Sequence, residues 1–218
     1  MLPAPLDAER IGRLLETARG DRAPDTWIRG GRIVSVHTEE VLEADVSVTD
    51  GRIAYVGAAP PAVADDTVVL DAHGSYVLPT YIEPHCHPWM LFNPDELARF
   101  TMPAGTTAYV AEMLNAQLLM DVADVRDLWR ALQRTPVRWH WAVRTAGQAA
   151  EDVAKQLPRT AIDQLLDEPG TVQIAEVTGW PQLLAGDTAL LDRVASAKAR
   201  GLRVDGHGAG ASTRRVPA

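Results

Sequence analysis

The chain has 218 residues, and 29 acidic side chains against 21 basic ones give it a formal net charge of −8. This balance argues against a nucleic-acid partner, because phosphates attract basic surfaces. Hydrophobic residues make up 46% and charged residues 23%, which is ordinary for a globular protein and excludes a disordered or fibrous chain.

Location follows from what the sequence lacks. The single cysteine, Cys86, excludes an intramolecular disulfide framework and fits a reducing compartment. No apolar run approaches the ~20 residues needed to span a bilayer. The first residues, MLPAPLDAERIGRLL, lack the basic-then-apolar pattern of a signal peptide. We therefore expect a cytoplasmic protein with no membrane partner.

The N-terminal third predicts a helix followed by a small antiparallel sheet. Apolar residues at helical spacing indicate a helix in residues 1–20, which Gly20 is placed to end. Alternating apolar residues then predict short strands through residues 21–78, and Asp50-Gly51 is a strong hairpin signal. About 50 residues of sheet are too few to bury a good core. We expect half of a small β-sandwich.

From residue 79 the pattern changes to strands that alternate with helices. Strands are expected near residues 81–87, 107–112, 137–143, 172–176 and 202–205, and helices near residues 94–105, 118–132, 149–166 and 188–200. Repeated βα units predict a parallel sheet, either open or closed as a barrel. We expect residues 79–211 to form this α/β domain and residues 212–218 to form a loose tail.

Two histidines, His85 and His87, close the first strand of this domain. Alternate residues of a strand point to the same face, so both imidazoles can reach one ion at the carboxyl end of the strand. Parallel α/β folds place their functional sites at that end. A His-x-His pair alone is weak evidence, because such histidines are more often half-exposed strand residues than ligands.

Two later strand ends strengthen the metal hypothesis. Glu176 closes one strand and His207 closes the next. Taken alone, Glu176 is more simply a solvated carboxylate and His207 a residue of a glycine-rich loop. Taken together with His85 and His87, they form a ligand set suited to a borderline divalent metal such as Zn²⁺, Fe²⁺ or Mn²⁺. We predict that these four residues bind metal.

Several segments also follow a known order of motifs. Residues 76–87 (YVLPTYIEPHCH) are similar to a Pro-Gly-(Phe/Tyr)-Ile-Asp-x-His-x-His strand, residues 175–181 (AEVTGWP) to a Gly-Glu-(Met/Val)-Met-Asn-Phe-Pro segment, and residues 204–210 (VDGHGAG) to a Val-Asp-Gly-His-Ala-Pro-Gly loop. These motifs resemble the amidohydrolase superfamily and, within it, the adenine deaminases. The resemblance runs from about residue 14 to residue 211.

The resemblance implies a (β/α)₈ TIM-type barrel beside a small β-sandwich. It implies that His85 and His87 hold one metal, that Glu176 bridges two metals, and that His207 ligates the second. Glu176 and His207 would also be the catalytic residues. The implied cofactor is a divalent metal, as one or two ions of Zn, Mn or Fe. The implied reaction is hydrolytic deamination of a 6-aminopurine in purine metabolism, with water activated by the cation.

Some positions depart from the family pattern. Residues 88–90 (PWM) stand where the family has a polar Glu and serines after the histidine pair. Glu112 stands where the family has Asp-Pro-His-Glu, and is either a substitute carboxylate or a strand-end surface residue. We expect His140 to be a packed strand histidine, and Arg144 could touch an anionic or carbonyl group. The substrate is therefore a purine base or a related cyclic amidine or amide.

The length of the chain leaves three hypotheses. At about 30 residues for each βα unit, residues from 79 onward supply about five of eight strands. The sixth-strand histidine and the late aspartate of the family have no counterpart here. The chain is then the N-terminal part of an adenine-deaminase-like enzyme, a related amidohydrolase acting on another cyclic amide or amidine, or a truncated, inactive fragment or interaction module. Open strand edges also favour association, including a homo-oligomer.

Overall fold

The computed structural model describes residues 5–58, 62–90, 92–145 and 158–207. These residues form two compact units, one ending at Pro79 and one starting at Thr80. The described helices are all too short or too polar to cross a membrane. The expected tail at 212–218 and the first part of the helical region expected at 149–166 lie outside the described residues.

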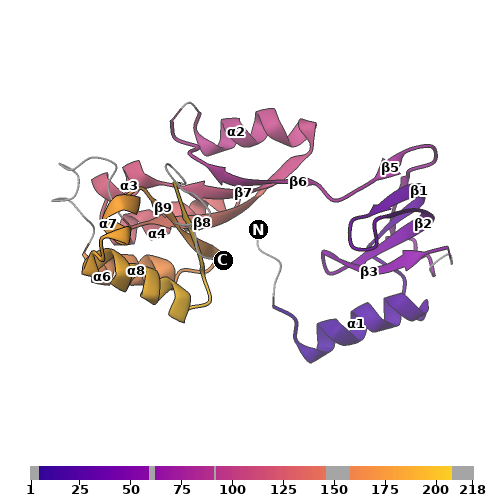
Figure 1. Cartoon of the computed structure of the whole chain (residues 1–218). Coiled ribbons are helices and arrows are strands. Elements are labelled where there is room, and N and C mark those ends of the chain that lie inside the picture. The colour runs from indigo at the N-terminus through magenta and orange to yellow at the C-terminus, as the bar shows by residue number, and fades with distance from the viewer. Residues whose placement is uncertain (1–4, 59–61, 91, 146–157, 208–218) are drawn as a thin grey trace. The chain divides into compact units, whose positions relative to one another are not determined.

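The first unit is a helix and one five-stranded sheet, in which β3, β2, β1 and β4 are neighbours in that order and β5 also pairs with β1 (Figure 1). Its elements are α1 (Ala8–Arg19), β1 (Thr26–Ser35), β2 (Glu40–Thr49), β3 (Arg52–Gly57), β4 (Val68–Asp71) and β5 (Tyr76–Val77). The β1–β2 and β2–β3 pairs are antiparallel, as expected. In contrast, β4 and β5 pair with β1 in parallel, β4 beside residues 26–29 and β5 beside Arg32 and Ile33.

Local sequence signals explain how these elements start and stop. The Asp7 side chain caps α1 by accepting a hydrogen bond from the Arg10 backbone N–H at 2.8 Å, and Gly20 ends it at φ 81°. Asp50 and Gly51 both take positive φ, as a tight hairpin turn requires. The buried core of this sheet is small and consists of Ile33, Ala44 and Val46.

The second unit is a parallel five-stranded sheet in the order β10-β9-β8-β7-β6. Its strands are β6 (Tyr81–Cys86), β7 (Thr106–Glu112), β8 (Arg138–Arg144), β9 (Thr171–Val177) and β10 (Arg203–Gly206). Its described helices are α2 (Pro94–Thr101), the 3₁₀ turn η1 (Met102–Ala104), α3 (Leu114–Leu119), α4 (Val122–Leu132), α6 (Arg159–Leu166), α7 (Trp180–Leu184) and α8 (Thr188–Ala199).

The prediction of helices was wrong in two places. The single helix expected over 118–132 is divided into α3 and α4, because Met120 and Asp121 take extended backbone angles between them. Asp121 is a good residue for the start of a helix, which favours a new beginning at this point. The short helix α7 was not predicted.

A large aromatic core lies between the parallel sheet and its helices. The Trp129 and Trp141 rings stack with centroids 4.7 Å apart, as do the rings of Tyr109 and Trp139. Helices α2, α4, α6 and α8 all contribute to this core. Figure 1 shows the helices arranged around the strands. The sheet is curled, and it forms the half-barrel that the sequence predicted.

Candidate metal centre

The carboxyl end of β6 directs two imidazoles toward one carboxylate. His85 is the penultimate residue of β6 and His87 directly follows the strand. Their Nε2 atoms lie 3.3 Å apart, and Glu176 Oε1 lies 2.8 Å from His85 Nε2 and 3.0 Å from His87 Nε2. The ligand atoms of these three residues all lie within 4.8 Å of one another.

The donor set fits a borderline divalent cation. When each imidazole carries its proton on Nδ1, the three converging atoms all present lone pairs, and a cation between them relieves their repulsion. A tetrahedral zinc ion with Zn–N bonds of about 2.0–2.1 Å separates two nitrogen ligands by ~3.3 Å, and the two Nε2 atoms have this spacing. Imidazole and carboxylate ligands together suit Zn, Mn or Fe.

Each imidazole is oriented by a second carboxylate. His85 Nδ1 lies 2.8 Å from Asp205 Oδ2, and His87 Nδ1 lies 2.8 Å from Glu112 Oε2. A carboxylate bound to one ring nitrogen holds the proton there and leaves the other nitrogen free to bind metal. Sequence reasoning left the role of Glu112 open and missed Asp205. The available signal was its place two residues before His207, on the same strand end.

Buried charges surround the carboxylate of Glu176. Only 2% of Glu112, 1% of Arg144 and 6% of Glu176 is exposed. Arg144 Nη1 lies 2.5 Å from Glu176 Oε2 and 3.8 Å from Glu112 Oε2. Burial favours a raised pKa for Glu176, but the hydrogen bond and charge of Arg144 outweigh it and lower the pKa to about 2. Glu176 is therefore an anion at neutral pH.

Glu112 shows the opposite balance. Burial raises the pKa of its carboxyl group, and the nearby charges of Arg144 and His87 only partly oppose this. Arg144, expected to touch an anionic or carbonyl group, faces the carboxylates of Glu112 and Glu176, which belong to the chain itself.

Two of the other histidines differ in their contact with this cluster. His207 Nε2 is 3.3 Å from Glu176 Oε2, and about half of the His207 side chain is exposed. His207 thus contacts Glu176 but is not among the three residues whose ligand atoms converge. His140, on β8, is half-buried, and burial lowers its pKa. Among the described residues it is not part of the converging group, in agreement with its predicted packing role.

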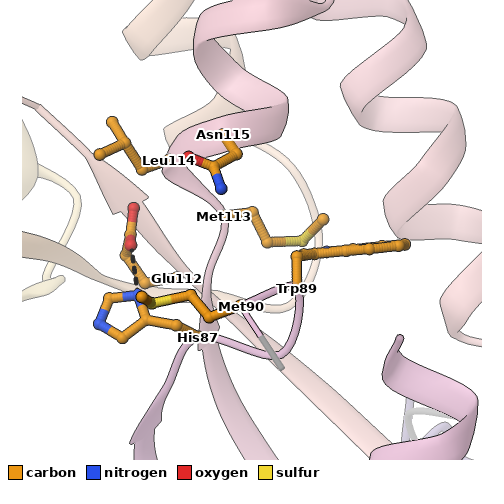
Figure 2. A pocket seen from close by; sticks show the side chains of 7 residues that line it. All are labelled: His87, Trp89, Met90, Glu112, Met113, Leu114 and Asn115. Atoms are coloured by element: carbon orange, nitrogen blue, oxygen red, sulfur yellow. Dashed lines mark ion pairs between the residues drawn. The ribbon is translucent and has the colours of Figure 1, made fainter. Parts of the chain in front are cut away.

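A pocket of about 130 Å³ opens beside His87 (Figure 2). One part of its lining comes from the segment after β6 and the other from the end of β7 and the start of α3. Its residues are His87, Trp89, Met90, Glu112, Met113, Leu114 and Asn115. The pocket is therefore lined by the residues that depart from the family pattern.

Solved structures share this fold. A crystal structure of an adenine deaminase matches with a TM-score of 0.59 at 18% identity, covering 84% of this chain and 50% of that one. A D-hydantoinase structure matches with a TM-score of 0.54 at 20% identity, and the match covers 84% of this chain and 40% of that one. An N-acyl-D-glutamate deacylase from Bordetella bronchiseptica, solved with zinc, matches at 0.53 with 22% identity, covering 89% and 48%. The parallel-sheet unit has the fold of part of an amidohydrolase-type barrel.

Curated sequences narrow the relationship. A protein of Bacillus anthracis named "putative adenine deaminase" is 31% identical over 94% of this chain and 35% of its own length. An adenine deaminase of Nitratidesulfovibrio vulgaris is 31% identical over 94% of this chain and 35% of its own length. No family model matches the chain. The predicted resemblance to adenine deaminases is confirmed, and the chain spans about a third of the length of these relatives.

Proposed function

We propose that this chain forms the metal-binding part of an adenine-deaminase-like hydrolase, which replaces the amino group of a 6-aminopurine with oxygen and releases ammonia. One observation carries the proposal: the side chains of His85, His87 and Glu176 converge at the carboxyl end of a sheet with the amidohydrolase fold. The similarity to curated adenine deaminases supports the purine substrate.

His85, His87 and Glu176 would hold the cation, with His207 as a further ligand beside Glu176. A divalent cation bound there supplies Lewis acidity and lowers the pKa of water into the neutral range. The chain's own contribution is to fix its ligands, because Asp205 and Glu112 hold the two imidazoles by their Nδ1 atoms.

Glu176 and His207 would handle the protons. Hydrolysis adds water to the ring carbon that bears the amine, breaks the C–N bond and protonates the departing nitrogen. His207 Nε2 lies 3.3 Å from Glu176 Oε2, and where it does not hold an ion a small shift would let the two share a proton. Because half of His207 is exposed, it can exchange that proton with solvent.

The pocket beside His87 suits a flat heterocycle. Trp89 and Met113 offer apolar surface, and the carboxamide of Asn115 offers one donor and one acceptor. This pairing matches the edge of a purine. It also matches a cyclic amide or another cyclic amidine, which the departures at residues 88–90 and Glu112 favour as the second candidate substrate.

The test is ammonia release by the chain loaded with Zn²⁺ or Mn²⁺ and completed by the barrel strands that these 218 residues lack. We expect release from adenine, and none from a variant that combines His85→Ala with His87→Ala. Release from cyclic amides or imides alone would favour the second candidate. A completed chain that binds metal but turns over no substrate in the panel would contradict both and favour a non-catalytic, metal-binding role.

A further inference from the structure

The geometry points to a centre for one metal ion, in which the guanidinium of Arg144 takes the place of a second cation. We infer that Arg144 is a positioning residue that limits the site to a single divalent ion. This inference rests on the proposed metal site. It differs from the two-metal arrangement that the family resemblance implies.

The carboxylate of Glu176 is divided between two positive partners. Its Oε1 atom meets His85 and His87, where the cation would lie. Its Oε2 atom is 2.5 Å from Arg144 Nη1 and 3.3 Å from His207 Nε2. A carboxylate that bridges two metals uses one oxygen for each, and here the guanidinium already occupies the second oxygen.

The ligands around Arg144 would suit a metal if the guanidinium were absent. Arg144 Nη1 lies 2.5 Å from Glu176 Oε2 and 3.8 Å from Glu112 Oε2, and His207 Nε2 lies 3.3 Å from the same Glu176 oxygen. Two carboxylates and an imidazole are a sound donor set for a divalent ion. Arg144 therefore occupies a position that could otherwise hold a second metal.

The charge balance supports one ion. Three carboxylates, from Glu112, Glu176 and Asp205, face one guanidinium, so the cluster has two negative charges in excess. A single divalent cation neutralises this excess. A second would leave an unbalanced charge of +2 beside the buried Glu112, Glu176 and Arg144, which is unfavourable.

The fold holds Arg144 in place from both sides of its backbone. The buried Gln117 carboxamide accepts a hydrogen bond from the Arg144 N–H at 3.0 Å and donates one to the Arg144 carbonyl at 3.2 Å. Gln117 belongs to α3, the helix that follows β7, so α3 holds the end of β8 beside the carboxylates of Glu112 and Glu176. The backbone of Arg144 is therefore held in place by hydrogen bonds that do not involve its guanidinium.

The test counts Zn²⁺ ions bound to each chain by equilibrium dialysis and metal analysis. We expect one ion in the wild type even with excess Zn²⁺, two in Arg144→Ser, and one in the matched control Arg144→Lys, which keeps the positive charge. Adding His207→Ala to Arg144→Ser should return the count to one. Circular dichroism establishes that each variant is folded, and Arg144→Gln replaces Arg144→Ser if the serine variant does not fold.

The outcomes separate this inference from the proposed site. Two ions in the wild type, or one ion in a folded neutral variant, would overturn the role of Arg144 while leaving the metal centre intact. No bound ion in the wild type, or a count unchanged by His85→Ala with His87→Ala, would overturn the metal centre and this inference with it.

Discussion

Two histidine–carboxylate pairs in this protein have the same chemistry and opposite surroundings. In the small sheet, His73 Nδ1 lies 2.7 Å from Asp71 Oδ1, and more than half of each side chain is exposed. In the parallel sheet, His87 Nδ1 lies 2.8 Å from Glu112 Oε2, and only 1% of the Glu112 side chain is exposed. Nearly equal distances therefore occur in very different dielectric environments.

The difference teaches where electrostatics matters in this chain. An exposed pair is screened by water and contributes little to stability. A buried pair has lost its hydration, so its geometry is strongly constrained by its neighbours. The large aromatic core makes that burial feasible in the second unit, whereas the buried hydrophobic cluster of the small sheet consists of Ile33, Ala44 and Val46. Four changes test this contrast, in order of decreasing expected effect.

Replacing both His85 and His87 by Ala should abolish metal binding, because it removes two of the three converging ligand atoms. His73→Ala is the matched control, since it removes an exposed histidine that also contacts a carboxylate. Zn²⁺ content after dialysis measures both. Retention of the ion by the double variant would contradict the assigned ligands.

Trp139→Ala should lower the free energy of unfolding of the parallel-sheet unit by about 3–5 kcal/mol. Trp139 is fully buried, stacks on Tyr109 and donates its indole N–H to Thr135 Oγ1 at 2.9 Å. The control is Ile53→Ala in the small sheet, which is 67% exposed and should change stability by less than about 0.5 kcal/mol. Urea unfolding compares them, and equal losses would contradict the contrast.

Glu112→Gln should weaken Zn²⁺ binding about 10- to 100-fold, because the amide holds the Nδ1 proton of His87 less firmly than a carboxylate does. Asp71→Asn makes the same kind of change to the exposed pair and should leave the affinity unchanged. Competition with a zinc-binding dye gives both affinities. An unaltered affinity in Glu112→Gln would mean that His87 is oriented without it.

Asp71→Asn should have the smallest effect, and that effect should depend on pH. The His73 backbone N–H, the His73 ring and the Arg29 guanidinium hold the pKa of Asp71 well below its usual range. A carboxyl group whose pKa is lowered by folding stabilises the fold at pH values above its ordinary pKa of about 3.9. This stabilisation is lost as the pH falls through and below that value. Thermal unfolding should show a small difference from wild type at pH 7 that shrinks below about pH 4. A difference that grows in acid would contradict this sign.

Short-range patterns predicted most of the fold. The helix at residues 8–19, the Asp50-Gly51 turn and the strand ends of the βα units all follow from local periodicity and capping residues. The parallel pairing of β4 with β1 was not predictable, because it depends on contacts about 42 residues apart, such as Thr26 with Val68. The β-propensity of the residues in β4 does not specify that this strand pairs with β1.

The candidate site was predictable where a residue has the right chemistry at the end of a strand. His85, His87, Glu176 and His207 were found in this way, and the structure brings the first three together. Asp205 was missed because its role depends on a contact with His85 of β6, which is distant in sequence. Whether these residues bind metal and act in catalysis stays a prediction.

The contact between His85 and Asp205 has a consequence for folding. It joins β6 and β10, which lie at opposite ends of the strand order and are 120 residues apart along the chain. Closing so long a loop is entropically costly, and contacts of this range form slowly. The centre therefore cannot assemble before all five strands have paired. Uptake of a metal ion would then be a kinetic reporter of completed folding, because partly folded chains lack one side of the coordination sphere.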